Sequence, residues 1–197
     1  MPPFSEATRQ DPPARLGVPG LARVTTRYSP AQDRVGLAGA LPDGSPLLLW
    51  LTQRLLRRML PPLTAWLEGR GARPEQTGSV ADESAVQALY ADALQGFAQE
   101  AAQAHLMPQA PVQVPENAPA CLVQVVDVVV TPQALRLVFG DAQGAVATME
   151  LQAQPLRQWL GILYNAWGQA DWPTDLWPVW LQESPLARQA PAPAVVH

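Results

Sequence analysis

Hydrophobic and polar positions alternate along three short stretches near the start of the chain, and a helical pattern follows them. Residues 21–28, 34–41 and 46–51 are rich in β-branched and apolar residues, with breaks at 29–33 and 42–45. This pattern is typical of a three-stranded antiparallel meander. Apolar residues then recur at a spacing that predicts a helix with one buried face: Leu55, Leu56, Met59, Leu60, Leu63, Trp66 and Leu67.

Two further features of this predicted helix stand out. Pro61 and Pro62 lie in its middle, and because proline lacks a backbone N–H we expect a kink or a restart there. Arg54, Arg57 and Arg58 fall on the face away from the leucines, forming a patch of three guanidinium groups. Such a patch is either a solvated helix face or a binding site for an anion or an acidic partner.

The order of strands and helix recurs about a hundred residues later. In the predicted strands, Arg34, Val35 and Leu37 match Arg136, Leu137 and Phe139 at an offset of 102. In the predicted helices, four residues match at an offset of 100, since Leu56, Arg57, Leu60 and Leu63 align with Leu156, Arg157, Leu160 and Leu163. We therefore predict an α+β fold built from an internally duplicated β-β-β-α unit, with repeats at 21–69 and 121–168.

Segments outside the repeats complete one predicted compact domain over residues 21–181. A helix over 82–106 has no counterpart in the second repeat, and a proline-rich connector spans 107–120. Residues 1–20 and 182–197 are rich in proline and poor in large apolar side chains, so we expect disordered tails. Helical spacing predicts that the 82–106 helix buries one apolar stripe: Val86, Leu89, Tyr90, Leu94, Phe97 and Ala101.

Three tryptophans follow the second repeat helix within nine residues, at Trp172, Trp177 and Trp180. Prolines interrupt this segment, so it forms no long helix. Two interpretations remain open. The segment either lies back over the fold and completes the core, or it presents tryptophan to a partner, since tryptophan and arginine dominate binding hot spots.

Charge and composition exclude several classes of protein. The chain has thirteen arginines and no lysine, which excludes Schiff-base, Walker-type and Ser-Lys chemistry. We expect that usage to reflect codon bias in a GC-rich genome. Residues 1–80 hold ten arginines against six acids, and residues 81–197 hold three against eleven. This asymmetry fits packing of one half on the other, head-to-tail self-association or a charged partner.

Sequence signals for catalysis and for metal binding are weak. The two histidines are His105, at a predicted helix end, and His197, in a predicted tail, and Cys121 is the single cysteine. A Cys121–His105 pair or an Asp171–Asp175 carboxylate pair is the remaining catalytic option, although a buried thiol and turn-forming aspartates explain these residues more simply. We expect no enzyme activity, no cofactor and no metal site.

We therefore expect a non-enzymatic protein of the bacterial cytoplasm that binds another protein or a second copy of itself. The single cysteine fits a reducing compartment, and no secretory signal or membrane span is evident. The predicted partner-binding residues are Arg54, Arg57, Arg58, Trp172, Trp177 and Trp180. The alternative is a single-stranded nucleic-acid-binding protein, which net charge disfavours; its sheet residues are Arg23, Arg27, Arg34, Arg136, Tyr28, Trp50 and Phe139. A small-molecule-binding or carboxylate-dependent enzyme role is less favoured.

Overall fold

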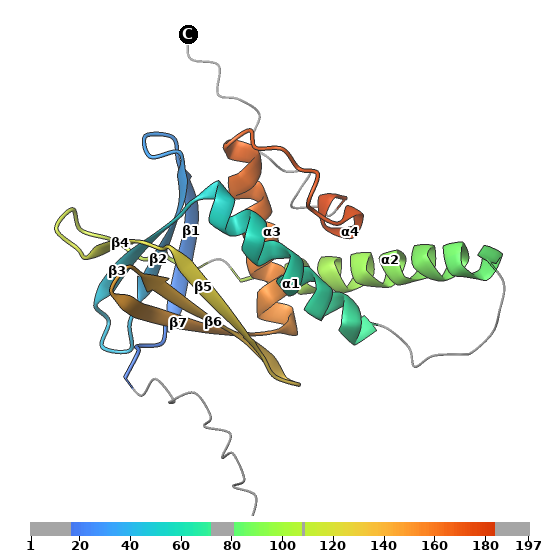
Figure 1. Ribbon diagram of the computed structural model, residues 1–197, viewed down its shortest axis with the longest axis horizontal. Helices are drawn as coiled ribbons and strands as arrows, with labels where there is room; N and C mark the ends of the chain where they lie inside the picture. The colour runs from blue at the N-terminus through green and yellow to red at the C-terminus, as the bar shows by residue number, and fades with distance from the viewer. Residues whose placement is uncertain (1–16, 72–80, 108, 184–197) are drawn as a thin grey trace, which may run out of the picture.

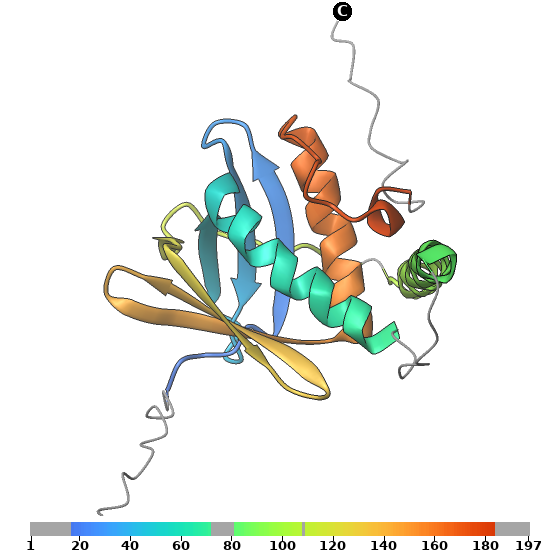
Figure 2. The same cartoon turned by 45° about the vertical axis from the view of Figure 1, so that its right-hand side comes forward.

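The structure is a computed structural model that describes residues 17–71, 81–107 and 109–183. These residues form a mixed α+β fold with two sheets and four helices. Figures 1 and 2 show helices α1 and α3 lying over one side of the sheets, with α2 extending away from them. Most of the predicted tails, residues 1–16 and 184–197, lie outside the described residues, as do residues 72–80 between the first repeat and the following helix.

The first sheet is the predicted meander with one added strand. Strands β1 (Arg23–Ser29), β2 (Arg34–Ala40) and β3 (Pro46–Leu51) pair antiparallel, and β4 (Ala120–Leu122) pairs parallel with β3. The β2–β3 turn uses Gly44 at φ +85°, a conformation that glycine adopts without steric cost. The boundaries of the three predicted strands agree with the structure to within two residues.

The second sheet has the same strand order. Strands β5 (Val125–Val130), β6 (Ala134–Asp141) and β7 (Gly144–Gln152) form an antiparallel meander. Its β6–β7 turn places Gly144 at φ +136°, and Asp141 Oδ1 accepts hydrogen bonds from the backbone N–H groups of Gln143 and Gly144. The order of three strands followed by a helix thus occurs twice, and common duplication of the two units stays a prediction.

A short segment just before β5 pairs with the first sheet, and a short segment just before β1 pairs with the second sheet. Val123 N donates to Trp50 O on β3, and Gln124 N then donates to Gly140 O on β6. At the opposite side, Leu21 N donates to Thr148 O on β7 before the chain enters β1. The apolar run over 121–130 by itself predicts a single strand, and this is wrong because the segment changes its pairing partner between β4 and β5.

Helix α1 (Gln53–Gly71) follows the first sheet in sequence, and helix α3 (Ala153–Gln169) follows the second. Each helix also packs on the other sheet. Helix α1 follows β3 but packs on β5, and α3 follows β7 but packs on β1 as well. A restart of α1 at the prolines is a wrong prediction, since one helix runs through Pro61 and Pro62; a kink there stays a prediction. Both prolines are solvent-exposed, so water reaches the backbone carbonyls that lose their helical donors.

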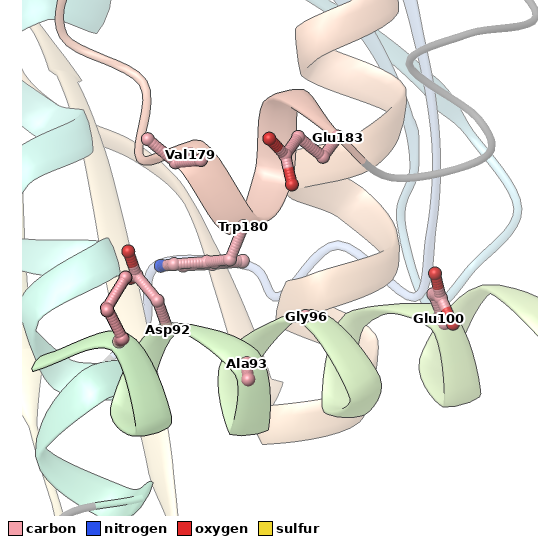
Figure 3. Close-up of a pocket in the computed structure, with 8 residues that line it drawn as sticks. Asp92, Ala93, Gly96, Glu100, Val179, Trp180 and Glu183 are labelled. Atoms are coloured by element: carbon pink, nitrogen blue, oxygen red, sulfur yellow. The ribbon is translucent and has the colours of Figure 1, made fainter. Parts of the chain in front are cut away.

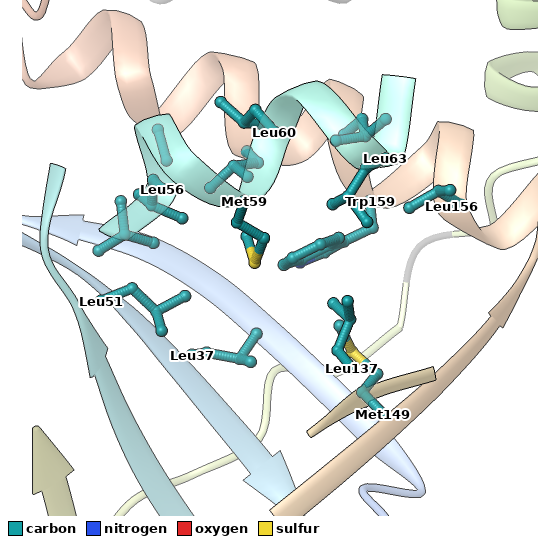
Figure 4. Close-up of a cluster of buried hydrophobic side chains, with 14 of the residues drawn as sticks. Leu37, Leu51, Leu56, Met59, Leu60, Leu63, Leu137, Met149, Leu156 and Trp159 are labelled. Carbon is teal, nitrogen blue, oxygen red and sulfur yellow. The ribbon is translucent and has the colours of Figure 1, made fainter. Parts of the chain in front are cut away.

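One hydrophobic core joins both halves of the chain. Leucines of β2, β3, α1 and α3 meet there with Trp159 and Met149, as Figure 4 shows. The apolar positions that align between the halves are fully or almost fully buried: Val35 with Leu137, Leu37 with Phe139, Leu56 with Leu156, Leu60 with Leu160, and Leu63 with Leu163. Trp159 Nε1 also donates to Thr26 Oγ1 at 3.0 Å, fixing α3 to β1.

The remaining two helices lie outside the strand-and-helix units. Helix α2 (Ala81–Ala104) runs beside α3 and α1, and the short helix α4 (Val179–Gln182) lies against α2. Figure 1 shows the far end of α2 standing clear of the sheets. Of the helices in the described ranges, none has the length and apolar character that a membrane crossing requires.

Candidate functional site

Helix α2 turns its apolar stripe toward solvent, which corrects the sequence prediction. The stripe was expected to be buried, yet Leu89 is 72% exposed, Tyr90 64% and Phe97 68%. Leu94 and Ala101 are also exposed, while the side chain of Val86 lies outside the described residues. We call Leu89, Tyr90, Leu94 and Phe97 the apolar face of α2.

The opposite face of α2 is polar and buried. Gln95 and Gln99 are 4% and 0% exposed, and small Ala102 lies beside them. Gln95 Nε2 donates to Leu67 O of α1 at 3.3 Å, and Gln99 Nε2 donates to Arg157 O of α3 at 3.0 Å. Helix α2 is therefore held to the fold by side-chain hydrogen bonds to backbone carbonyls, where a typical surface helix uses apolar packing.

A buried arginine explains why this polar face points inward. Arg157 of α3 is 8% exposed, and it donates to both Gln95 O and Gln95 Oε1. Burial lowers the pKa of the Arg157 guanidinium, while the charge of Glu68 opposes that shift. Because an arginine remains charged, its burial requires oxygen acceptors, and α2 supplies them.

Trp180 of α4 covers the contact between Arg157 and α2. The Arg157 guanidinium carbon lies 5.2 Å from the centre of the Trp180 ring, and Trp180 Nε1 donates to Glu68 Oε1 at 3.1 Å. The indole thus shields a buried cation and bonds an anion of α1 at the same time. These contacts join α1, α2, α3 and α4 at one point.

A groove runs between α2 and α4 beside this contact, as Figure 3 shows. Its apolar lining is Leu89, Ala93, Gly96, Val179 and Trp180, and its acidic lining is Asp92, Glu100 and Glu183. Leu89 belongs to both the groove and the apolar face of α2. The two surfaces therefore adjoin along the helix.

The predicted arginine patch is exposed but divided. Arg54, Arg57 and Arg58 are all solvent-exposed, and Arg57 NH2 lies 3.2 Å from Asp175 Oδ2. The hydrogen bond from Arg57 lowers the pKa of the Asp175 carboxyl. One of the three guanidinium groups is thus occupied within the chain, and the role of the patch in partner binding stays a prediction.

The tryptophan segment lies in the core. Trp172, Trp177 and Trp180 are 9%, 3% and 3% exposed. The rings of Trp172 and Trp177 stand edge-on to the buried Trp167, with centroids 5.0 and 5.6 Å from it. A role for these tryptophans in partner binding also stays a prediction, and their burial removes most of the contact area that a partner would use.

His105, Cys121 and Asp175 each contact a different residue. His105 Nδ1 lies 2.7 Å from Ala101 O, and Cys121 Sγ donates to Asp141 Oδ2 at 3.6 Å. Burial and the Asp141 charge raise the pKa of the Cys121 thiol, which disfavours the nucleophilic thiolate. Asp175 pairs with Arg57 rather than with Asp171. Within the described ranges, no three His, Cys, Asp or Glu side chains form a metal-binding group.

A second groove crosses the outer side of the first sheet. Arg27, Tyr28 and Trp50 line it together with the connector residues Val112, Gln113 and Val114. Small residues of β2 form its floor, and the Trp50 ring would be 3.1 Å from a Cβ on Gly36. Phe139, which was expected on a sheet surface, is fully buried.

Comparison of the chain with protein-family models, with curated proteins and with solved structures finds no match. The candidate site is therefore defined by its own geometry.

Proposed function

We propose that this chain is a non-enzymatic protein-binding module with an assembly or accessory role in the bacterial cytoplasm. The observation that carries the proposal is the exposure of the apolar face of α2. Burying side chains such as Leu89, Tyr90 and Phe97 against a partner stabilises a complex by roughly 1.5–3 kcal/mol each before the costs of association. Contiguous exposed apolar side chains commonly mark interaction surfaces.

The placement of α2 in the chain supports this role. We propose that residues 21–69 and 121–168 are two copies of one β-β-β-α unit, supported by their shared strand order and their buried aligned positions. Helix α2 lies between the two units and adds little apolar side-chain area to their common core. An inserted helix of this kind is available for a separate task, and the partner is another protein or a second copy of this chain.

The test compares partner recovery by two variants of the tagged full chain in cells that express it. Tyr90→Ser with Phe97→Ser removes aromatic area from α2. Val125→Ser with Val130→Ser removes exposed apolar area from β5, where these residues are 52% and 58% exposed. Because all four side chains are exposed, we expect each double variant to keep the wild-type fold by circular dichroism.

Loss of one stoichiometric partner by the α2 variant alone would support the proposal. Size-exclusion chromatography with light scattering would identify that partner as a second copy if the wild-type mass halves in the α2 variant. Recovery of the same partner by both variants, or recovery of no partner by the wild type, would refute a binding role for the apolar face of α2.

A single-stranded nucleic-acid-binding role is the second candidate, because Arg27, Tyr28 and Trp50 line one groove. Stacking of bases on aromatic rings beside a cation is the usual arrangement for such binding. The formal net charge of −4 weakens the electrostatic contribution. Fluorescence polarisation with a labelled single-stranded oligonucleotide tests this candidate: it requires binding that falls with added salt and in Arg27→Glu, and an absence of binding at low salt rejects it.

A further inference from the structure

The groove between α2 and α4 extends the apolar face of α2 toward the rest of the fold. Leu89, Ala93 and Gly96 are spaced along one side of α2, and Val179 with Trp180 forms the facing wall. Figure 3 shows the Trp180 ring lying between α4 and α2, above Ala93. One face of this ring meets Arg157, so the indole is held in place before any ligand arrives.

Gly96 leaves part of this groove empty. A Cβ built on Gly96 would meet no atom within 4 Å outside the adjoining chain and the backbone of its own helix turn. Packing in the described structure thus gives no reason for glycine here, although glycine in a helix interior costs about 1 kcal/mol relative to alanine. A close approach by another chain is one physical reason for a glycine at such a position.

Among the described residues, the charged residues that line the groove are acidic. Helix α2 contains four acidic residues and no basic residue. Among the described residues the salt bridges are Arg57–Asp175 and Arg136–Glu150, so neither Asp92 nor Glu100 is neutralised by a cation of the described chain. Glu183 of the α4 end lies on the same groove.

We infer that this groove binds a cationic amphipathic segment of a partner protein. The inference rests on the proposed function and specifies the chemistry of the partner. Apolar side chains of the segment pack against Leu89, Ala93 and Val179, while its arginine or lysine side chains pair with Asp92 and Glu100. Opposite charges at such a rim favour encounter and select against acidic competitors.

A peptide selection tests the inference directly, because it lets the groove choose its own ligand. A phage library of random 16-residue peptides is selected on the immobilised full chain, in parallel with Gly96→Arg and Gly168→Arg. The first substitution puts a long cation into the groove. The second is the matched control, because Gly168 is a helical glycine of α3 with equally open surroundings. Wild type and control are expected to enrich the same basic peptides with apolar residues at helical spacing, and Gly96→Arg is expected to lose them.

An enriched peptide is then measured by fluorescence polarisation against the charge-neutral variant Asp92→Asn with Glu100→Gln. We expect at least a tenfold weaker affinity for this variant, and a wild-type affinity that falls as salt is added. Enrichment of acidic or uncharged peptides, equal enrichment on Gly96→Arg, or no enrichment at all would overturn the inference. The partner-recovery test on Tyr90 and Phe97 is scored separately, so a protein-binding role survives if only the charge assignment fails.

Discussion

Helices α1 and α3 bury leucines at matching positions, but the arginine beside those leucines is exposed in α1 and buried in α3. Arg57 of α1 is exposed and pairs with Asp175 at 3.2 Å, whereas Arg157 of α3 is buried under Gln95 and Trp180. The difference arises because α2 and α4 cover α3 at this position. The comparison shows how an inserted helix can attach to one of two similar units by recognising one buried charge.

Magnitudes explain why α2 presents its polar face to the core. Exposing Leu89, Tyr90 and Phe97 forgoes roughly 1.5–3 kcal/mol for each side chain. Turning those side chains inward would place them against Arg157, and a buried charge without acceptors costs several kcal/mol. It would also deprive Gln95 and Gln99 of their contacts. The orientation of α2 therefore follows from the arginine on α3.

The largest expected effect separates the segment after α3 from the end of α1. Trp177→Ala should lower the free energy of unfolding by about 3–5 kcal/mol, because it opens a cavity beside Trp167 and Tyr164. Trp66→Ala, at a half-buried tryptophan near the end of α1, should cost clearly less. Urea denaturation measures both. Equal losses of unfolding free energy in the two variants would contradict this prediction. So would a stable Trp177→Ala variant with weakened partner binding, which would place Trp177 on a partner-binding surface.

The two arginines give the next effect. Arg157→Met should lower the free energy of unfolding by about 3 kcal/mol, since it removes both hydrogen bonds to Gln95 and leaves the buried Gln95 Oε1 without its donor. Arg57→Met should change it by less than about 1 kcal/mol, because its ion pair is exposed. Similar losses in the two variants would show that α2 is not anchored by Arg157.

Local pattern was sufficient for the parts of the fold whose burial follows periodicity. The alternation in β2 and β3 predicted strands, and the leucine spacing of α1 and α3 predicted helices. Both patterns also identified the core, because the apolar positions of these elements are the buried ones. The division of residues 121–130 between β4 and β5 depends on hydrogen bonds to β3 and β6. Those partners are distant in sequence, and periodicity carries no information about them.

The candidate site was missed for a related reason. The apolar stripe of α2 was found, but its direction was inferred from hydrophobicity alone. Gln95 and Gln99 are four residues apart, and this spacing indicated only weakly that a second face of α2 is ordered. Their buried partner Arg157 lies about sixty residues away, and its alignment with Arg57 indicated a solvent-exposed position. Burial of a charge depends on which element covers it, and this the sequence pattern did not indicate.

A third prediction tests whether the C-terminal ends of α1 and α3 respond alike to the same substitution. Gly69 lies near the end of α1 and Gly168 near the end of α3, and a Cβ added to either glycine would meet no atom within 4 Å. Gly69→Ala and Gly168→Ala should each raise the free energy of unfolding by about 0.5 kcal/mol, because alanine restricts the unfolded chain and favours helix. Thermal denaturation measures the gain. Opposite signs would mean that the two helix ends differ in backbone conformation.

The smallest effect concerns the titration of Asp175, the partner of the exposed arginine. Its pKa lies below the ordinary value of 3.8 because Arg57 donates to the ionised carboxylate. The pair therefore contributes stability above about pH 4, and that contribution is lost as the pH falls through the lowered pKa of the folded state. In Arg57→Met the Asp175 midpoint should rise toward 3.8, as followed by carboxyl carbon NMR, while Arg58→Met should leave it unchanged. A midpoint that moves equally in both variants would assign the shift to the general positive field of α1, and the contrast between a paired Arg57 and a buried Arg157 would then rest on burial alone.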